Sequence, residues 1–382
     1  MSAGPKRVRV LFVLPSLKRA GAETQLVNLV SKLDGSLFES HVFSFEQNLD
    51  QLDILRNAGI PHHHHLRKSK YDFGYTKVLA ELIDRYDIDI VHCSLQFALL
   101  AGWLARRQAK RQPALVAAIH TTLNRSVKEE LQDRLLYRWL LASCSSIIFV
   151  CETQRQHWVD KYPALGSLSV TIYNGIDPER FRRTADIEQR AASLRAQLGI
   201  SQDSVVLTAV AGFRTEKRHD LLVRAFERLQ PTTHLLLAGD GPTRAATEEQ
   251  ASRLGLGSRV HFLGAVADIR PVLAASTATV LASTAVETFS MAVLESMSMG
   301  VPVIVPDLSG LPEAVERDKS GFVYATGDLN ELTHALAKMA DMSVSERVEK
   351  GLAARQRLLD NFTEAQMVAQ TEALLQRLSR NN

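Results

Sequence analysis

A net charge of only +3 over 382 residues gives no reason to expect a nucleic-acid partner, and a chain of this length is typical of two domains. The three cysteines, Cys93, Cys144 and Cys151, have neither the spacing of a zinc site nor the even number of a disulfide framework, so we expect a reducing compartment. The charge is unevenly divided. Residues 1–175 carry 22 Lys and Arg against 16 Asp and Glu, a net of +6, and the remainder carries 23 against 26, a net of −3.

The apolar runs are too short for a membrane-spanning helix. The longest one after the first strand, residues 97–105, falls far short of the roughly 20 residues that cross a bilayer. The apolar run near the start alternates as a strand does and lacks a secretory cleavage site. We therefore predict a soluble, cytoplasmic protein.

Short apolar runs alternate with helical patterns through the first half of the chain. The predicted strands are 8–14, 40–45, 89–93, 115–120 and 146–150, and the helices between them include 22–33, 75–86 and 128–143. Continuous apolar strands separated by helices are typical of parallel sheets that are covered on both faces.

The alternation stops at 169–181, where Asn-Gly and Asp-Pro indicate turns, and then begins again with "VVLTAVAGF", "HLLLAGDG", "VHFLGAV" and "VPVIVP". We predict an α/β protein with two Rossmann-like parallel-sheet domains, residues 1–175 and 176–360, followed by a last helix at 361–382. Two such domains facing a central cleft would bind ligands there, at the carboxyl ends of their strands.

The segment "VETFSMAVLES" (286–296) contains two carboxylates in apolar surroundings, Glu287 and Glu295. A helix is predicted from about Ser290, with Gly300 in the position that follows a helix end. Glu287 then lies in the loop before the helix and Glu295 inside it. The helix start suits a phosphate, and Glu295 is suited to accept hydrogen bonds from ribose-type hydroxyls, although most helical glutamates simply face solvent.

This segment, continued by "MGVPVI" and "SGLPEAV", resembles the C-terminal signature of the retaining glycosyltransferases of family four, which have the GT-B fold. Other pieces follow the family's order along nearly the whole chain: "RAGAETQLVNL", "AAIHTT", "IYNGIDPERF", "FRTEKRHDLLVRAF", "LLLAGDGP" and "VHFLGAV". The resemblance implies a hexosyltransferase that moves a sugar from a nucleotide-diphosphate donor to a hydroxyl acceptor by same-face substitution. It also implies that the last helix returns to the first domain.

In the first domain, the resemblance implies an acceptor-binding surface that includes Gly21 and His120. Gly21 opens the helix after the first strand, where a glycine lets the backbone approach a ligand closely. The family usually has two glycines here, and this chain has Ala20 in place of one. His120 ends a predicted strand and is implied to lie beside the transferred sugar as a catalytic residue.

In the second domain, the resemblance implies that Lys217, together with Arg214, neutralises the departing diphosphate. Many family members carry the arginine five residues before the lysine, where this chain has Gly212. Glu287 is implied to hold the sugar hydroxyls and Glu295 the ribose.

Backbone groups are implied to complete the donor site. The amides of Phe289, Ser290 and Met291 would meet the sugar or its phosphate, and the backbone of Val266 would meet the base. The family requires no Asp-x-Asp metal site, so we expect no cofactor, no metal ligand and no dependence on divalent metal. The expected partners are a nucleotide-sugar donor and a hydroxyl acceptor, which is a lipid-linked saccharide, a polysaccharide precursor or a small molecule.

Several other functions remain open. A sugar-nucleotide epimerase shares the architecture, whereas a phosphorylase would need a pyridoxal-binding lysine for which no motif is present. An inactive binding protein would be expected to lose Glu287, Lys217 or His120, and all three are present. The missing Gly-x-Gly-x-x-Gly fingerprint counts against a dehydrogenase.

Two further stretches allow more than one interpretation. The tract His62–His65 has no acidic or cysteine neighbour in sequence, which counts against a metal site, and the family resemblance implies a strand edge here. The helix at 97–111 ends in four basic residues, Arg106, Arg107, Lys110 and Arg111. A solvated helix end is the more common case, and peripheral contact with an anionic membrane is the alternative.

Overall fold

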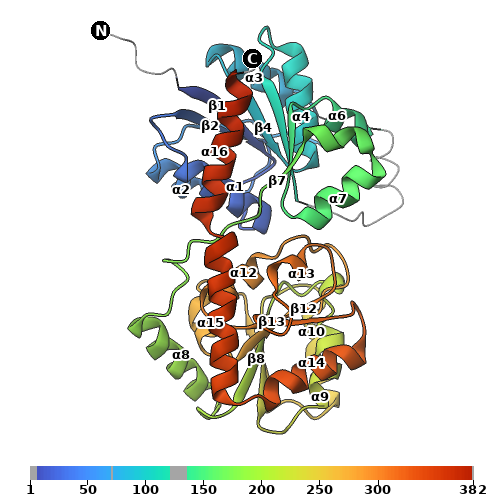
Figure 1. Ribbon diagram of the computed structural model, residues 1–382. Coiled ribbons are helices and arrows are strands. Elements are labelled where there is room, and N and C mark those ends of the chain that lie inside the picture. The colour runs from blue at the N-terminus through green and yellow to red at the C-terminus, as the bar shows by residue number, and fades with distance from the viewer. Residues whose placement is uncertain (1–6, 70–71, 121–135, 381–382) are drawn as a thin grey trace. The chain divides into compact units, whose positions relative to one another are not determined.

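The computed structural model describes residues 7–69, 72–120 and 136–380, which form two units (Figure 1). Unit 1 comprises Met1–Asn174 and Glu364–Asn382, and unit 2 comprises Gly175–Thr363. Within unit 2, Ile176 and Thr363 form an isolated parallel β-bridge, close in sequence to the two points where the chain passes from one unit to the other. The helix predicted at 128–143 lies partly outside the described residues, and its described part contains α6 (Arg138–Ala142).

Unit 1 contains a parallel sheet with the strand order β3-β2-β1-β4-β5-β6-β7. Its strands are β1 (Val8–Leu14), β2 (Phe38–Ser44), β3 (His62–His64), β4 (Ile90–Ser94), β5 (Ala114–Ile119), β6 (Ser146–Phe149) and β7 (Ser169–Thr171). All of its pairings are parallel. The strands predicted from the sequence are confirmed to within two residues at each end.

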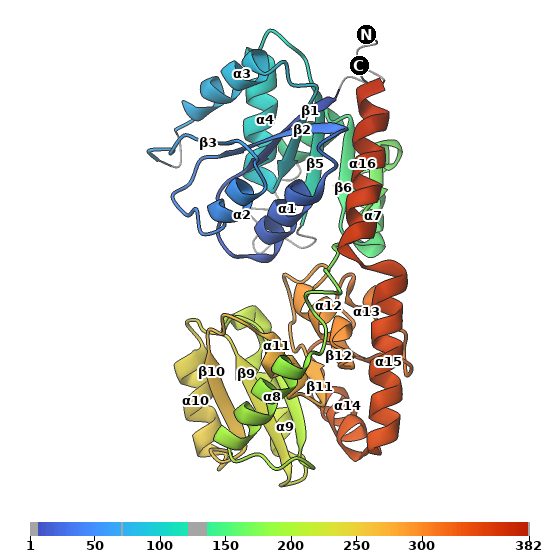
Figure 2. The same cartoon turned by 90° about the vertical axis from the view of Figure 1, so that its left-hand side faces the viewer.

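Helices cover both faces of this sheet (Figure 2). One face packs on α1 (Gly21–Lys32), α2 (Leu52–Asn57) and α16 (Glu364–Arg380), and the other on α3 (Tyr75–Arg85), α4 (Gln96–Gln108), α6 and α7 (Glu152–Lys161). Successive strand residues serve opposite faces, so that Phe12 packs in the first layer and Val13 in the second. The last helix of the chain therefore belongs to the core of unit 1, where Leu375 is fully buried.

Unit 2 contains a second parallel sheet, with the order β10-β9-β8-β11-β12-β13. Its strands are β8 (Val205–Val210), β9 (Thr233–Ala238), β10 (Val260–Gly264), β11 (Ala278–Val280), β12 (Val303–Pro306) and β13 (Gly321–Tyr324). The predicted α/β architecture with two Rossmann-like parallel sheets is confirmed.

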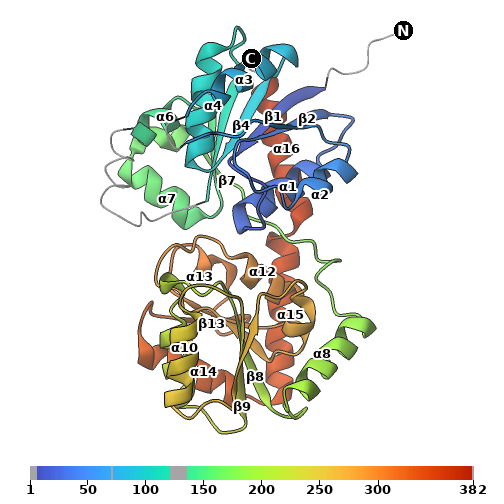
Figure 3. The same ribbon diagram turned by 180° about the vertical axis from the view of Figure 1, so that it is seen from behind.

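The helices of unit 2 also lie on both sides of its sheet (Figure 3). The larger core contains α9 (His219–Glu227) and α14 (Leu329–Asp341), and the smaller one α8 (Ala185–Gln197) and α11 (Arg270–Ala274). The remaining helices are α10 (Arg244–Arg253), α12 (Met291–Ser298), α13 (Leu311–Ala314) and α15 (Val344–Asn361). None of the helices in the described part of the chain is long and apolar enough to cross a membrane.

Each sheet reverses its strand order at one point, between β1 and β4 in unit 1 and between β8 and β11 in unit 2. In open parallel sheets, ligands bind outside the carboxyl ends of the strands near such a reversal. The segments that follow these strands are therefore the places to look for a site.

Helix α15 crosses α12 at a point where only glycine fits. A Cβ atom added to Gly351 would lie 2.1 Å from the carbonyl oxygen of Gly300. Gly300 has φ of 69°, the left-handed conformation that was expected just after α12.

We expect Gly351→Ala to lower the free energy of unfolding by about 1–3 kcal/mol, because the helices must separate to admit the methyl group. Urea denaturation monitored by circular dichroism would measure the change. Gly257→Ala is the matched control, since no atom lies within 4 Å of the added Cβ. Equal stability of the two variants would contradict the close contact.

Candidate functional site

The loops that follow β8 and β9 are held together by their backbones. Phe213 N donates to the Asp240 carbonyl at 2.9 Å, and Thr243 N donates to the Phe213 carbonyl at 3.1 Å. A Cβ on Gly239 would lie 2.0 Å from the Ala211 oxygen, and one on Gly241 would lie 2.5 Å from the Phe213 oxygen. The two glycines of "GDGP" therefore allow a close approach that fixes the loop carrying Arg214 and Lys217.

Lys217 forms a buried ion pair with Glu287. Its ammonium group contacts Glu287 Oε1, and each side chain is only 10% exposed. The Ser283 hydroxyl donates to the same carboxylate oxygen at 3.2 Å. The pair joins the end of the loop after β8 to the loop after β11, so two residues 70 positions apart in sequence form one charged centre.

The backbone beside this pair adopts unusual conformations. Val286, just before Glu287, has φ of 58°, and Arg218, just after Lys217, has φ of 49°. A β-branched residue with positive φ costs on the order of 1–3 kcal/mol and is found mostly at functional sites. Both outliers lie next to residues that were singled out from the sequence.

Helix α12 begins beside Glu287. Ser290 is its N-cap residue and has extended backbone angles, but its side chain makes no capping hydrogen bond. The first hydrogen bond of the helix joins Leu294 N to the Ser290 carbonyl at 3.3 Å. The amides of Met291 and of the next two residues come before this bond in the first turn. Such amides and the positive end of the helix dipole favour an anion.

Glu295 lies in the second turn of α12 and is largely buried. Burial raises the pKa of its carboxyl group to about 7, an effect that the nearby positive charge of Arg180 partly offsets. A buried carboxylate of this kind is costly without a hydrogen-bonding partner.

The segment "SGLPEAV" supports the loop that carries Glu287. Gly310 N donates to the Thr288 carbonyl at 3.0 Å, which ties the start of α13 to this loop. The Phe289 ring is 4% exposed and packs edge-on against Phe362, with 5.1 Å between ring centroids. Only the main chain of Phe289 is therefore suited to ligand contact.

Neither Arg214 nor Val266 is a member of the ion pair. The Arg214 side chain is 48% exposed and its guanidinium pairs with Glu216 at 3.3 Å. Val266 packs its side chain against the smaller core of unit 2. At Gly212, an added Cβ would make only an ordinary contact, 3.6 Å from the Asp240 oxygen.

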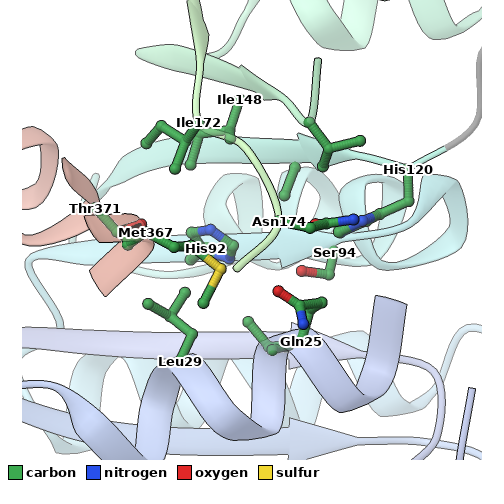
Figure 4. Close-up of a pocket in the computed structure, with 13 residues that line it drawn as sticks. Gln25, Leu29, His92, Ser94, His120, Ile148, Ile172, Asn174, Met367 and Thr371 are labelled. Atoms are coloured by element: carbon green, nitrogen blue, oxygen red, sulfur yellow. Dashed lines mark hydrogen bonds between the residues drawn. The ribbon is translucent and has the colours of Figure 1, made fainter. Parts of the chain in front are cut away.

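In unit 1, His120 lies just beyond the end of β5 and lines a cavity of about 40 Å³ (Figure 4). Burial lowers the pKa of the His120 imidazole to about 4, so it is neutral near pH 7. The other polar residues that line the cavity are Gln25, His92, Ser94, Asn174 and Thr371. Gly21, the first residue of α1, is exposed and does not line it.

Sequence reasoning missed His92 and Ser94. The sequence carried part of the signal, because residues 92 and 94, like 118 and 120, have the two-residue period of one sheet face. That Ser94 pairs with Ala118 across β4 and β5 is shown only by the structure. Sequence reasoning also missed that Lys217 and Glu287 bind each other, for which the sequence carries no signal.

The first three histidines of the tract form the edge strand β3, as the family resemblance implied. His63 contacts His41 at 3.1 Å between ring nitrogens, and the Ser44 hydroxyl lies 2.9 Å from His62 Nε2. Within residues 7–69, 72–120 and 136–380, no group of three His, Cys, Asp or Glu side chains is placed to hold a metal ion.

The basic end of α4 is partly neutralised. Arg111 pairs with Asp87 and Asp89 at 3.2 and 3.3 Å, and the Lys110 and Arg111 amides donate to Asp84. Arg107 stacks on the Trp103 ring, 4.9 Å from its centroid. These contacts fit a solvated helix end, and membrane contact stays a prediction.

Two family profiles match consecutive parts of the chain. The profile described as Glycosyltransferase Family 4 matches residues 19–180, and the one described as Glycosyl transferases group 1 matches residues 191–357. The first match lies almost wholly in unit 1 and the second lies in unit 2. The chain belongs to this family of glycosyltransferases and has the GT-B fold, so the resemblance seen in its motifs is confirmed.

The sequence identity between this chain and individual relatives is low. The chain is 26% identical over 309 residues to N-acetyl-alpha-D-glucosaminyl L-malate synthase of Bacillus anthracis. The aligned region covers 80% of this chain and 78% of that relative. It is 25% identical to UDP-Gal:alpha-D-GlcNAc-diphosphoundecaprenol alpha-1,3-galactosyltransferase of Escherichia coli, covering 74% of each chain. Anabaena HepE in complex with UDP-glucose superposes with a TM-score of 0.83 at 23% identity, over 97% of this chain and 100% of HepE.

Because Glu295 is buried, the free energy of unfolding should depend on pH. The pKa of Glu295 is about 7 in the folded protein against 4.5 ordinarily, so between pH 4.5 and 7 the folded state holds the extra proton and stability falls as the pH rises. We expect Glu295→Gln to raise the free energy of unfolding at pH 8, by at most about 3 kcal/mol, and to change it little at pH 4.5.

Urea denaturation of the ligand-free protein across this pH range would measure the effect. Glu349→Gln, on the exposed surface of α15, is the matched control for the loss of a carboxylate. A Glu295→Gln variant that is less stable than the wild type at pH 8 would show that the carboxylate is well paired in the free protein.

Proposed function

We propose that this glycosyltransferase is a retaining enzyme that transfers a sugar from a nucleotide-diphosphate donor to a hydroxyl acceptor. The observation that carries the proposal is the buried Lys217–Glu287 ion pair beside the start of α12. A cation, a carboxylate and the amides at the start of a helix, on three adjoining segments, match the diphosphate and hydroxyl groups of such a donor.

On the donor side, the Lys217 ammonium neutralises the diphosphate as the bond to the sugar breaks, with Arg214 as a second cation. The amides around Phe289, Ser290 and Met291 donate to the sugar or its phosphate. Glu287 accepts hydrogen bonds from the sugar hydroxyls, and Glu295 accepts them from the ribose. Val266 meets the base through its backbone.

In the same-face substitution that we propose, the acceptor attacks the face from which the diphosphate leaves. The departing phosphate oxygen takes the acceptor's proton as the new bond forms, so the reaction needs no protein nucleophile. His120, which is neutral near pH 7, lies beside the transferred sugar and orients its hydroxyl groups. Gly21 provides an approach for the ligand at the start of α1.

The relatives narrow the first donors and acceptors to test. HepE was crystallised with UDP-glucose, and the Escherichia coli relative is named for UDP-galactose and a lipid-linked acceptor. A UDP-sugar donor and a lipid-linked or small hydroxyl acceptor are therefore our first candidates. Contact with an anionic membrane would accompany a lipid-linked acceptor.

A thermal-shift screen with UDP-, GDP- and ADP-sugars tests donor binding directly. We expect stabilisation by one nucleotide class, followed by transfer to a hydroxyl acceptor with the donor's anomeric configuration preserved, as measured by NMR of the product. Release of an isomerised sugar without acceptor would indicate an epimerase. An inverted product would refute the retaining mechanism.

We expect Lys217→Ala to lower kcat about 100-fold or more, because it removes the cation that meets the developing charge and leaves Glu287 buried without its partner. Steady-state kinetics with the donor found in the screen would measure this. Lys319→Ala, an exposed lysine of unit 2, is the matched control. Turnover of Lys217→Ala at the control's rate would refute the assigned role.

We also expect no dependence on divalent metal. Lys217 and the helix amides are the positive groups that we assign to the diphosphate, so initial rates should stay unchanged in excess EDTA. Activity that vanishes with EDTA and returns with magnesium would contradict this assignment.

A further inference from the structure

The cavity beside His120 is large enough to hold water. Its volume of about 40 Å³ compares with the 10–15 Å³ that one water molecule needs by the same kind of measure. Its apolar walls include Leu26 and Leu29 of α1, Ile148 of β6 and Met367 of α16. The polar side chains of β4 and His120 project between these walls (Figure 4).

Two of the residues that line this cavity, His92 and Ser94, each have a polar atom that is unsatisfied among the described residues. Within the described part of the chain, His92 Nδ1 and Ser94 Oγ are buried polar atoms that form no hydrogen bond with the protein. Both side chains are 2% exposed. A buried polar atom without a hydrogen bond destabilises the fold, so such atoms are normally satisfied by ordered water when there is room for it.

The strands place these atoms in a row that leads to His120. His92 and Ser94 occupy alternate positions of β4, and Ser94 pairs with Ala118 of β5, two residues before His120. Figure 4 shows the Ser94 side chain between the two imidazole rings in that view. Burial lowers the pKa of His92 to about 4, with a smaller contribution from the positive charge that His120 would carry if protonated.

We propose that this cavity holds a chain of ordered water that joins His92, Ser94 and His120, and that His92 is a positioning residue which fixes the orientation of the His120 imidazole. A neutral imidazole has one donor and one acceptor nitrogen, and the hydrogen bonds around it decide which is which. The water chain holds His120 in one tautomer and one ring orientation, so the same nitrogen always faces the substrate.

The water chain is independent of the proposed function, whereas its importance for catalysis rests on that function. The first test therefore uses the full-length chain without substrate. Histidine is labelled with ¹⁵N at both ring nitrogens, and the His120 signals are assigned with His120→Gln. In the wild type we expect a single His120 tautomer across pH 5–8.

We expect His92→Phe, which keeps a ring but removes its nitrogens, to give a mixture of His120 tautomers. His92→Gln, whose amide can bond to the water, should restore the single tautomer. His41→Phe is the matched control, because His41 is also buried in a strand of unit 1 but does not line the cavity. Ser94→Ala removes the middle of the chain and gives the same readout if His92→Phe does not fold.

The catalytic part is tested with the donor from the screen. We expect His92→Phe to lower kcat about tenfold while the KM for the donor changes little, since a misoriented group slows the chemical step. His92→Gln should recover most of the rate, and His41→Phe should match the wild type. A merely structural role would lower the melting temperature of His92→Phe and leave the rate of the folded enzyme unchanged.

Two results would overturn the proposal. One is an unchanged His120 tautomer in both His92→Phe and Ser94→Ala. The other is a high-resolution crystal structure in which the cavity contains no water bonded to His92 or Ser94. If no donor supports transfer at all, the proposed function fails, while the NMR comparison still decides whether the water chain exists.

Discussion

The buried ion pair between Lys217 and Glu287 depends on how two loops are brought to the same edge of a parallel sheet. Strands β8 and β11 are parallel neighbours, so the segments that follow them begin side by side. Gly239 and Gly241 let the backbone beyond β9 support the first loop, and the Gly310–Thr288 hydrogen bond supports the second. These backbone contacts hold two opposite charges together in a poorly hydrated place.

Polar groups that are buried among apolar residues recur at both places where a ligand is expected. In unit 2, burial raises the pKa of Glu295, and in unit 1 it lowers the pKa of His120. The charged form of each side chain would be more stable at a hydrated position on the surface. Titratable groups with strongly shifted pKa values are more common at functional sites than in ordinary cores, although a buried structural group can show the same shift.

Much of the fold could be predicted from the sequence. The strand β1 begins and ends where its apolar run does, and the end of α12 was marked by Gly300. The order of the strands could not be predicted from periodicity, because a two-residue or 3.6-residue pattern reports burial and not neighbours. His120 was identified only through its motif, and His92 and Ser94 were missed because a lone polar residue in a strand is usually structural.

The sequence by itself determined the alternating pattern of both sheets and the types of residue at Lys217, Glu287 and Glu295, because local propensity and motif spacing are properties of the chain. Only the tertiary structure decided which of these side chains meet. Lys217 pairs with Glu287, 70 residues away in sequence, and Arg214 pairs with Glu216. Helix α16 lines the same cavity as β4 and β5. Contacts between distant segments depend on strand order and helix packing, which the local sequence does not encode.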